Sequence, residues 1–311
     1  MPKVLVCDPL PEKFIEYLKE KGFEVDVVQS PPPNILCQII IDYDAIIVRS
    51  ATKVTAEVIK AGKRLRLVAR AGAGVDNIDV GAALEQGVKV VNTPDAVSNA
   101  VAELTLCLTL SLIRSVPSAI KSLKSGKWDK KIFIGRELAG LTVGIVGLGN
   151  IGTLVAMKMK ALGANVIAYR RNVDKLKKDS ERLGIEAAKS LEDLLSRSEL
   201  VTLHVPYDSS THHLINDSNI RLMTRTSYLI NTSRAWIIEG KALLAALNDG
   251  RLEGVAIDVH YNEPPCEDWE WKLIRHPRVI ATPHIGAQTK EANERIVRQL
   301  AEKIIAEFAE A

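Results

Sequence analysis

Short apolar runs alternate with longer amphipathic stretches through the first third of the chain. Runs typical of buried strands occupy residues 4–7, 25–28, 45–48, 65–69 and 88–91. A stretch with helical periodicity, residues 13–21, separates the first two runs. Strands that alternate with helices in this way predict a parallel sheet with helices on its faces.

A second series of the same kind begins at Leu141. Its strand-like runs are residues 141–146, 164–169, 200–205, 228–231, 254–259 and 278–281. The two series predict an α/β fold of two doubly wound, Rossmann-like parallel-sheet domains. We expect the active site in a cleft between them, at the carboxyl ends of the strands.

The last twenty or so residues predict one amphipathic helix, residues 290–309. The apolar side chains that fall on a single stripe are Ile296, Val297, Leu300, Ile304, Ile305 and Phe308. We expect this helix to return to the first domain. The predicted division is a discontinuous, flavodoxin-like substrate-binding domain (1–95 plus 286–311) and a dinucleotide-binding Rossmann domain (96–285).

The composition describes an ordinary globular chain: 311 residues, 47% hydrophobic and 25% charged. A net charge of +3 gives no reason to expect nucleic acid or an anionic membrane as a partner. The four cysteines form no C-x-x-C pair, so we expect no metal site and a cytoplasmic location. No signal peptide precedes the first strand, and the apolar residues 100–113 are short for a membrane span, which predicts a buried helix.

The glycine-rich segment 147–152 (GLGNIG) follows a strand-like run and precedes a helix-like one. In this context the spacing of Gly147, Gly149 and Gly152 predicts a turn that lets the backbone approach the pyrophosphate of a dinucleotide at a helix N-terminus. A tight strand-to-helix turn without a ligand is the alternative.

Arg170 and Arg171 follow the second strand of this unit, where a site for the unphosphorylated cofactor usually has an acidic residue. Guanidinium groups can bind the 2′-phosphate of NADP or stack on adenine. The residues therefore leave both NAD and NADP open, and solvated surface arginines are a further alternative.

Three polar residues come just after late strand-like runs: Arg234, Glu263 and His284. A guanidinium can clamp a substrate carboxylate and polarise the neighbouring C2 oxygen. An imidazole can take the C2 hydroxyl proton as hydride leaves, and a carboxylate beside it stabilises its protonated form. Each residue alone also fits a surface or turn position, but the three together favour the oxidation or reduction of a 2-hydroxy acid.

At this point the chain resembles the D-isomer-specific 2-hydroxyacid dehydrogenases along nearly its whole length, and their phosphoglycerate branch above all. The segments that carry the similarity are residues 46–55, 70–77, 92–94, 126–128, 147–152, 231–234, 262–265 and 283–287. The glycine fingerprint belongs to many families, whereas the series Arg234, Glu263 and His284 with these flanks is specific to this one.

The resemblance implies a role for each matching residue. Arg234 binds and polarises the substrate, His284 is the acid/base group and Glu263 is its partner. The implied cofactor-binding residues are Gly147, Gly149, Asn150, Ile151, Gly152, His204, Val205, Pro206, Thr232, Ser233, Asp258 and Gly286, to which Arg170 is added from its position after the second strand. Among them, Asn150 and Ile151 present backbone amides to the pyrophosphate, and Asp258 holds the nicotinamide carboxamide.

The resemblance also implies a substrate-binding set in the first domain. The main chain of Arg70, Ala71, Gly72, Ala73 and Gly74 receives the substrate carboxylate. Arg49, next to Ser50 and with a contribution from Arg70, receives the distal phosphate. A dianionic phosphate needs a fixed cation besides Arg234, and this requirement agrees with the role of Arg49. A salt bridge at a strand end is the alternative role of Arg49.

The implied activity is oxidation of 3-phospho-D-glycerate to 3-phosphohydroxypyruvate, the entry step to serine. Val97 stands where the phosphoglycerate branch often has asparagine, which leaves NAD(P)H-dependent reduction of glyoxylate or hydroxypyruvate as the alternative. The chain ends soon after its last predicted helix, so we expect it to lack the regulatory domains through which longer relatives sense serine.

Relatives dimerise through the nucleotide-binding domain, and residues 100–138 are the candidate for a homodimer contact here. Core packing between the two domains is the competing use of this apolar segment. A nucleotide-sensing corepressor on the same fold is a third function to consider. It is disfavoured because the chain has neither a disordered motif-binding tail nor a basic patch.

Overall fold

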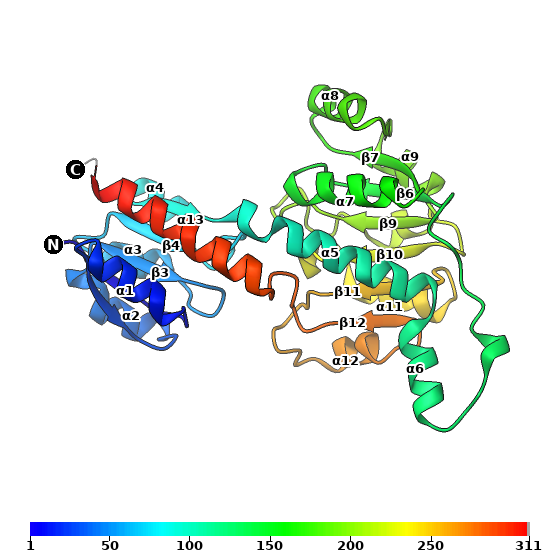
Figure 1. Cartoon of the computed structure of the whole chain (residues 1–311), viewed down its shortest axis with the longest axis horizontal. Helices are drawn as coiled ribbons and strands as arrows, with labels where there is room; N and C mark the ends of the chain where they lie inside the picture. Colours follow the sequence, from blue (N-terminus) through cyan, green and yellow to red (C-terminus); the bar gives the residue numbers. More distant parts are fainter. Residues whose placement is uncertain (310–311) are drawn as a thin grey trace. The chain divides into compact units, whose positions relative to one another are not determined.

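The computed structural model describes residues 1–309. The chain divides into two compact units, which are drawn in Figure 1. The N-terminal unit comprises Met1–Val97 and the segment that begins at Ala287, and the central unit comprises Ser98–Gly286. The chain passes between them at residues 97/98 and 286/287, next to the limits of 95/96 and 285/286 expected from the sequence.

The N-terminal unit contains a five-stranded parallel sheet in the order β2-β1-β3-β4-β5. Its strands are β1 (Lys3–Val6), β2 (Glu24–Val27), β3 (Ala45–Val48), β4 (Leu67–Arg70) and β5 (Lys89–Asn92). The strand order reverses between β1 and β3, and a doubly wound sheet binds its ligands outside the carboxyl ends of the strands at such a point. Asp8 follows β1, and Arg49 follows β3.

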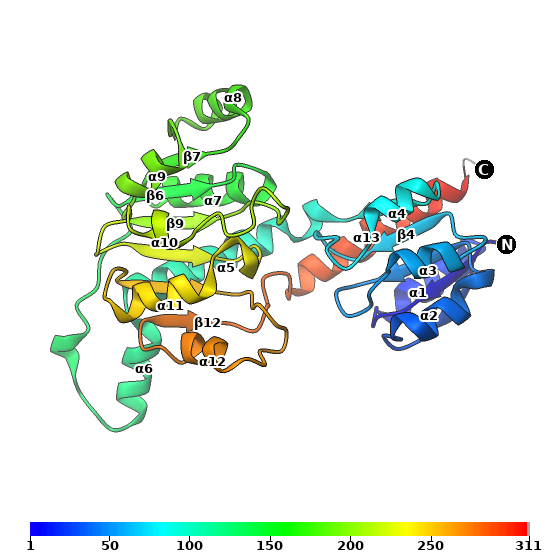
Figure 2. The ribbon, with the colours of Figure 1, turned by 180° about the vertical axis from the view of Figure 1, so that it is seen from behind.

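Helices cover both faces of this sheet (Figures 1 and 2). One face packs against α2 (Pro33–Ile39), α3 (Ala56–Ala61) and α4 (Val80–Glu85), and a short 3₁₀ turn, η1 (Ile40–Asp42), follows α2. Over the other face lie α1 (Glu12–Glu20) and α13 (Lys290–Ala309), the helix predicted from the apolar stripe.

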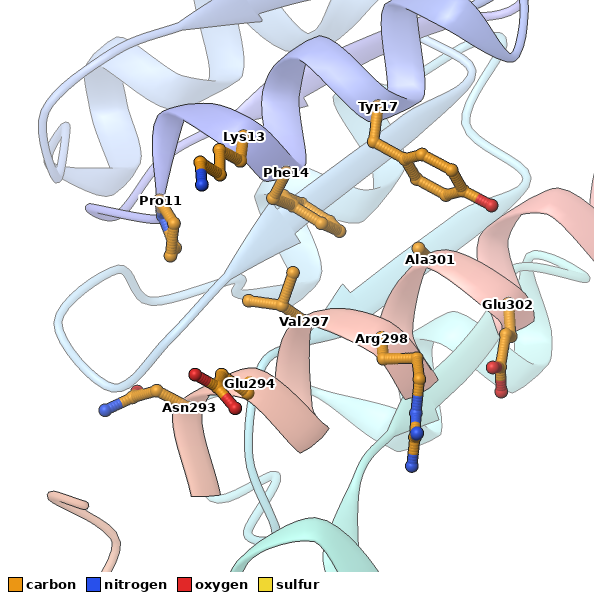
Figure 3. Close-up of a pocket in the computed structure, with 10 residues that line it drawn as sticks. All are labelled: Pro11, Lys13, Phe14, Tyr17, Asn293, Glu294, Val297, Arg298, Ala301 and Glu302. Carbon is orange, nitrogen blue, oxygen red and sulfur yellow. The ribbon is translucent and has the colours of Figure 1, made fainter. Parts of the chain in front are cut away.

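The two helices α1 and α13 form a groove of about 460 Å³ between them. Figure 3 shows Phe14 and Tyr17 of α1 opposite Val297 and Ala301 of α13. Ile296 and Leu300, on the predicted stripe, are buried, and burial of such a stripe is what holds a long amphipathic helix onto a sheet.

The central unit contains a seven-stranded parallel sheet in the order β12-β11-β10-β9-β6-β7-β8. Its strands are β6 (Thr142–Val146), β7 (Asn165–Tyr169), β8 (Glu186–Ala187), β9 (Leu200–Leu203), β10 (Tyr228–Asn231), β11 (Gly254–Ile257) and β12 (Val279–Ala281). The order from β8 to β11 is the 3-2-1-4-5-6 arrangement of dinucleotide-binding folds, extended by β12. The predicted fold class, two doubly wound parallel-sheet units, is confirmed.

Alternate residues of these strands face two apolar layers, as the two-residue period of a strand requires. Leu229 packs in one layer with α9 (Leu191–Arg197), α11 (Gly240–Asn248) and α12 (Asp268–Ile274). Ile230 packs in the other with α5 (Pro94–Ile113), α7 (Asn150–Ala161) and α8 (Val173–Leu183). Two short elements, α10 (Asp217–Ile220) and the 3₁₀ turn η3 (Ala235–Ile237), complete the connections.

By length and composition alone, the helix α5 is long and apolar enough to cross a membrane. However, 61% of its most apolar 18 residues are buried inside the protein. Ala102, Leu108 and Leu112 belong to the apolar layer of the central unit, so α5 packs as a core helix. The sequence left two uses open for residues 100–138, and the part of this segment that lies in α5 is used for packing within the central unit.

Exposed apolar side chains gather instead in the segment after α5. It contains α6 (Val116–Lys124), a 3₁₀ turn, η2 (Lys130–Ile132), and the chain leading to β6. The exposed members are Val116, Ile120, Leu123, Trp128, Ile132 and Ile134. We call this segment, residues 116–134, the apolar arm.

Candidate active site

The three glycines of the fingerprint turn differ in what a side chain at each position would meet. Gly147 has a φ of +98°, and a Cβ there would lie 2.6 Å from the carbonyl oxygen of His204. A Cβ on Gly152 would collide with the Gly147 carbonyl oxygen. A Cβ on Gly149 would meet no atom within 4 Å. Two glycines therefore let the chain pack closely, and the third leaves open space above the turn.

This open space lies at the start of α7. Gly149 is the N-cap residue of α7 and supplies no side-chain hydrogen bond to the first turn, where Asn150 and Ile151 lie. The N-terminal N–H groups of a helix and its dipole attract an anion such as phosphate. The described residues thus fit a dinucleotide pyrophosphate at this turn.

Arg170 leads from the end of β7 back to the same turn. Its Nη1 donates to the carbonyl oxygen of Leu148 (3.1 Å) and to the carboxylate of Asp179 on α8 (2.9 Å). Arg171 contacts Ser210 and pairs with Asp208 at 3.4 Å. Arg170 is thus held beside the fingerprint by an acidic partner from α8, a contact that its sequence position alone does not reveal.

The chain after β9 and the chain after β10 contact each other at the carboxyl edge of the sheet. The Ser233 hydroxyl donates to the carbonyl oxygen of Val205. The Thr202 hydroxyl lies 3.0 Å from Nε2 of His204, and burial lowers the pKa of His204 to about 3. The His204 ring is therefore neutral at physiological pH and suits a structural or binding role. Pro206 and Thr232 lie in the same two segments.

Arg234 is placed by the main chain around it. Asn231 ends β10, donates through its side-chain amide to the Arg234 carbonyl oxygen (2.9 Å) and accepts from the Ser233 N–H (3.0 Å). Nη1 of Arg234 donates to the Ser233 carbonyl oxygen at 2.8 Å. Arg234 is half-buried and follows the end of β10.

His284 and Glu263 form a hydrogen-bonded pair. Nδ1 of His284 lies 2.8 and 2.9 Å from the two carboxylate oxygens of Glu263. Because a carboxylate only accepts, Nδ1 carries the proton and Nε2 is left for another partner. Burial acts to raise the pKa of Glu263, but the hydrogen bonds and charges of His284 and His260 together hold that pKa below its ordinary value.

The pair borders a pocket of about 340 Å³ in the central unit. Its other walls are mainly apolar and include Pro265, Trp271 and Ala281. The side chains of His284 and Glu263 are themselves 41% and 40% exposed, so a small molecule that enters beside these apolar walls can reach the pair.

Asp258 secures the loop that contains His284. Its carboxylate is 1% exposed and accepts from the Thr282 hydroxyl (2.6 Å) and from the N–H groups of Ile285 (2.9 Å) and Gly286 (2.8 Å). His284 has a φ of +53°, an uncommon backbone conformation for a residue with a side chain. The three hydrogen bonds of Asp258 hold the chain on both sides of His284.

In the N-terminal unit, buried polar groups hold the segment of Arg49. The main-chain N–H of Arg49 donates to Asp8 (2.5 Å), which is 2% exposed, and Asn77 donates to the Arg49 carbonyl oxygen (2.8 Å). The Arg49 guanidinium reaches Asn293 of α13 at 3.4 Å. Ser50 is exposed beside it.

The predicted carboxylate-binding segment 70–74 is partly engaged within the protein. The N–H of Ala71 donates to the Val48 carbonyl oxygen (2.8 Å), and the N–H of Gly72 donates to the Thr93 hydroxyl (3.0 Å). Nη1 of Arg70 donates to the Ala71 carbonyl oxygen at 3.3 Å. Among the predicted amides, those of Ala73 and Gly74 are therefore the better candidates for a ligand.

Comparison with known proteins assigns the chain to a family. Residues 106–286 match the family described as D-isomer specific 2-hydroxyacid dehydrogenase, NAD binding domain. The chain belongs to this family. D-3-phosphoglycerate dehydrogenase of Methanocaldococcus jannaschii is 43% identical over 304 residues, which cover 98% of this chain and 57% of that protein. Hydroxypyruvate reductase of Thermotoga maritima is 42% identical over 307 residues, which cover 98% of both chains.

A solved structure of the same fold contains both kinds of ligand expected of the family. The D-lactate dehydrogenase of Aquifex aeolicus, complexed with NAD and lactic acid, superposes with a TM-score of 0.85 at 27% identity. The superposition covers 97% of this chain and 94% of that one. Although this chain matches the hydroxypyruvate reductase end to end, it spans little more than half of the phosphoglycerate relative.

In this member of the 2-hydroxyacid dehydrogenase family, the predicted cofactor and catalytic residues follow the carboxyl ends of strands of the central sheet, and Glu263 is hydrogen-bonded to His284. The predicted substrate residues lie in the N-terminal unit. Sequence reasoning missed Asp8 and Glu270, two buried carboxylates beside the functional loops. The signals were weak: an acid directly after an apolar run for Asp8, and a capping pattern with Glu267 for Glu270. Within residues 1–309, no three His, Cys, Asp or Glu side chains are grouped as metal ligands.

Proposed function

We propose that this chain is an NAD(P)-dependent D-2-hydroxyacid dehydrogenase whose chemistry takes place at the carboxyl edge of the central sheet. The observation that carries the proposal is the bond between His284 Nδ1 and Glu263. The two residues follow β12 and β11, strands of the parallel sheet whose β6 leads into the glycine turn. Family membership supports the same reaction.

Each side chain has a role set by its chemistry. Arg234 binds the substrate carboxylate and polarises the C2 oxygen. Nε2 of His284 accepts the C2 hydroxyl proton during oxidation and returns it during reduction, while Glu263 stabilises the imidazolium. A bound nicotinamide supplies the hydride acceptor, and the turn from Gly147 to Gly152 fits its pyrophosphate.

We assign the remaining predicted residues to the same ligands. Arg170, His204, Val205, Pro206, Thr232, Ser233, Asp258 and Gly286 surround the cofactor. In the N-terminal unit, the amides of Ala73 and Gly74 receive the substrate carboxylate. Both cofactors remain open at Arg170. With NAD its guanidinium stays paired with Asp179, and with NADP the 2′-phosphate competes with Asp179 for the same guanidinium.

The proposed substrate is 3-phospho-D-glycerate, oxidised to 3-phosphohydroxypyruvate in serine biosynthesis. Arg49, whose main chain is fixed by Asp8, supplies a cation for the phosphate. The phosphoglycerate dehydrogenase relative supports this substrate. A second candidate is NAD(P)H-dependent reduction of hydroxypyruvate or glyoxylate, because the hydroxypyruvate reductase relative matches the chain end to end. We further propose a cytoplasmic homodimer.

The catalytic proposal is tested by His284→Ala. We expect kcat to fall by about 10²- to 10⁴-fold, the range of general acid–base catalysis, with the cofactor Kd little changed. His276, at the opposite end of β12, is the matched control, and His276→Ala should keep wild-type kcat. Steady-state assays and fluorescence titration of NADH measure both quantities. Unchanged turnover in the His284 variant would remove the proposed mechanism.

The substrate is tested by reduction assays of the wild-type protein with NADH and with NADPH. A higher kcat/KM for 3-phosphohydroxypyruvate than for hydroxypyruvate and glyoxylate supports the phosphoglycerate activity. The reverse order assigns the chain to the reductase alternative.

A further inference from the structure

One buried side chain holds the loop that contains Glu263. Glu270, in the first turn of α12, is 2% exposed. Its carboxylate accepts from the Asn262 N–H (2.9 Å), the Asn262 side-chain amide (2.9 Å), the Cys266 N–H (3.1 Å) and the Glu267 N–H (3.0 Å). The chain on both sides of Glu263 is therefore bound to one carboxylate.

A helix cap explains only part of this arrangement. Glu267 and Glu270 form a capping box at the N-terminus of α12, in which Glu270 accepts from the Glu267 N–H. The two bonds to Asn262 and the bond to Cys266 lie outside the box. Glu270 thus binds the loop more extensively than a cap requires.

The chemistry of these contacts demands an ionised acceptor. All four partners are N–H donors, and a carboxylate accepts without donating. Burial acts to raise the pKa of Glu270, but the donors outweigh burial and keep it below its ordinary value. If a neutral amide replaced the carboxylate, its NH₂ group would face at least one of these N–H donors and could not accept from it.

We propose that Glu270 is a positioning residue that fixes the loop 262–267 so that the Glu263 carboxylate meets Nδ1 of His284. The inference rests on the proposed roles of Glu263 and His284. Asp258 holds the His284 loop through Thr282, Ile285 and Gly286. The two partners of the pair are therefore held by two different buried carboxylates, one on each loop.

The test compares Glu270→Gln with the matched control Glu267→Ala. Glutamine keeps the length of residue 270 but presents an NH₂ group to the loop donors. Alanine at residue 267 removes the other half of the capping box and leaves the bonds of Glu270 to Asn262 and Cys266 in place. We expect Glu270→Gln to lower kcat up to about 100-fold, as misplacement of a catalytic group does, with an unchanged NADH Kd. Glu267→Ala should keep wild-type kcat.

Thermal melting separates positioning from loss of fold. If Glu270→Gln unfolds, Asn262→Ala is the second variant, because it deletes one donor without placing an amide in the interior. We expect it to lower kcat by roughly threefold to tenfold, again with an unchanged NADH Kd. A fall in kcat no greater than that of Glu267→Ala, in whichever variant folds, overturns the inference.

His284→Ala keeps the two proposals apart. If it retains turnover, the proposed catalytic function itself fails. If it is inactive while Glu270→Gln and Asn262→Ala match Glu267→Ala, only the positioning role is wrong.

Discussion

At the scale of single residues, buried carboxylates hold the loops that contain the functional side chains. Asp8 binds the segment of Arg49, Asp258 binds the loop of His284 and Glu270 binds the loop of Glu263. Each is at most 2% exposed. A buried charge is costly unless hydrogen bonds compensate it, so each carboxylate keeps its donors, and hence its loop, in one arrangement.

Arg49→Ala tests the phosphate role at this scale. We expect kcat/KM to fall about 10- to 100-fold for 3-phosphohydroxypyruvate, the cost of a lost charge-assisted hydrogen bond, and to change little for hydroxypyruvate. Arg64, paired with Asp44 in the same unit, is the control, and Arg64→Ala should alter neither substrate. Equal losses on both substrates would argue against a phosphate site at Arg49.

The sequence identified His284 and Glu263 as candidates because each follows a strand-like run. It did not identify Glu270 as the support of the Glu263 loop, or Asp8 as the support of the Arg49 segment. Asp8 and the Arg49 N–H are 41 residues apart and meet only when β1 pairs with β3. No local pattern signals such a contact, since the donors come from other parts of the chain.

At the scale of elements, the strand β6, its turn and the helix α7 form the part of the molecule that the sequence predicted best. A turn with this spacing demands glycine for backbone reasons, so the motif is visible without tertiary contacts. The structure adds that the glycines are not equivalent, because only Gly149 opens onto free space.

Gly149→Ala and Gly152→Ala test this difference as a matched pair. The methyl group on residue 149 meets no atom within 4 Å, so that variant should fold normally and bind NADH roughly tenfold more weakly, because the methyl occupies the space of the pyrophosphate. The methyl on residue 152 meets the Gly147 carbonyl and should lower the free energy of unfolding by about 1–3 kcal/mol.

Thermal melting and NADH titration of the two variants provide the measurements. Wild-type NADH affinity in Gly149→Ala would contradict a pyrophosphate at this turn. A stable Gly152→Ala protein would contradict the close packing of α7 against the turn.

At the scale of the whole molecule, the apolar arm is the feature that a single chain leaves unexplained. Trp128, Ile132 and Ile134 are 82%, 71% and 88% exposed. Large apolar side chains that are this exposed are costly in water, and their burial is typical of a protein–protein contact. We therefore place the proposed homodimer contact on residues 116–134, later in the chain than the buried helix α5.

The dimer is tested by sedimentation or light scattering. The wild-type protein should have twice the 34.1 kDa mass of the chain, and Ile120→Glu with Leu123→Glu should reduce it to one chain. Leu84→Glu, on an exposed position of α4, is the control and should leave the mass unchanged. A wild-type monomer, or a dimer that survives both charges on α6, would contradict this contact.

The amino-acid sequence by itself determined the two series of strands and helices, the cofactor turn and the three catalytic candidates. These features depend on local periodicity and on backbone conformations that few residues tolerate. Tertiary structure decided that α5 is buried while α6 is exposed, that Arg170 meets Asp179, and that buried carboxylates hold the catalytic loops. Asp8 and the Arg49 N–H are 41 residues apart, and Asp258 and Gly286 are 28 apart, so only the folded sheets bring them within hydrogen-bonding distance. Asp179 and Glu270 lie nine and eight residues from Arg170 and Asn262, but local periodicity does not show which of these side chains meet.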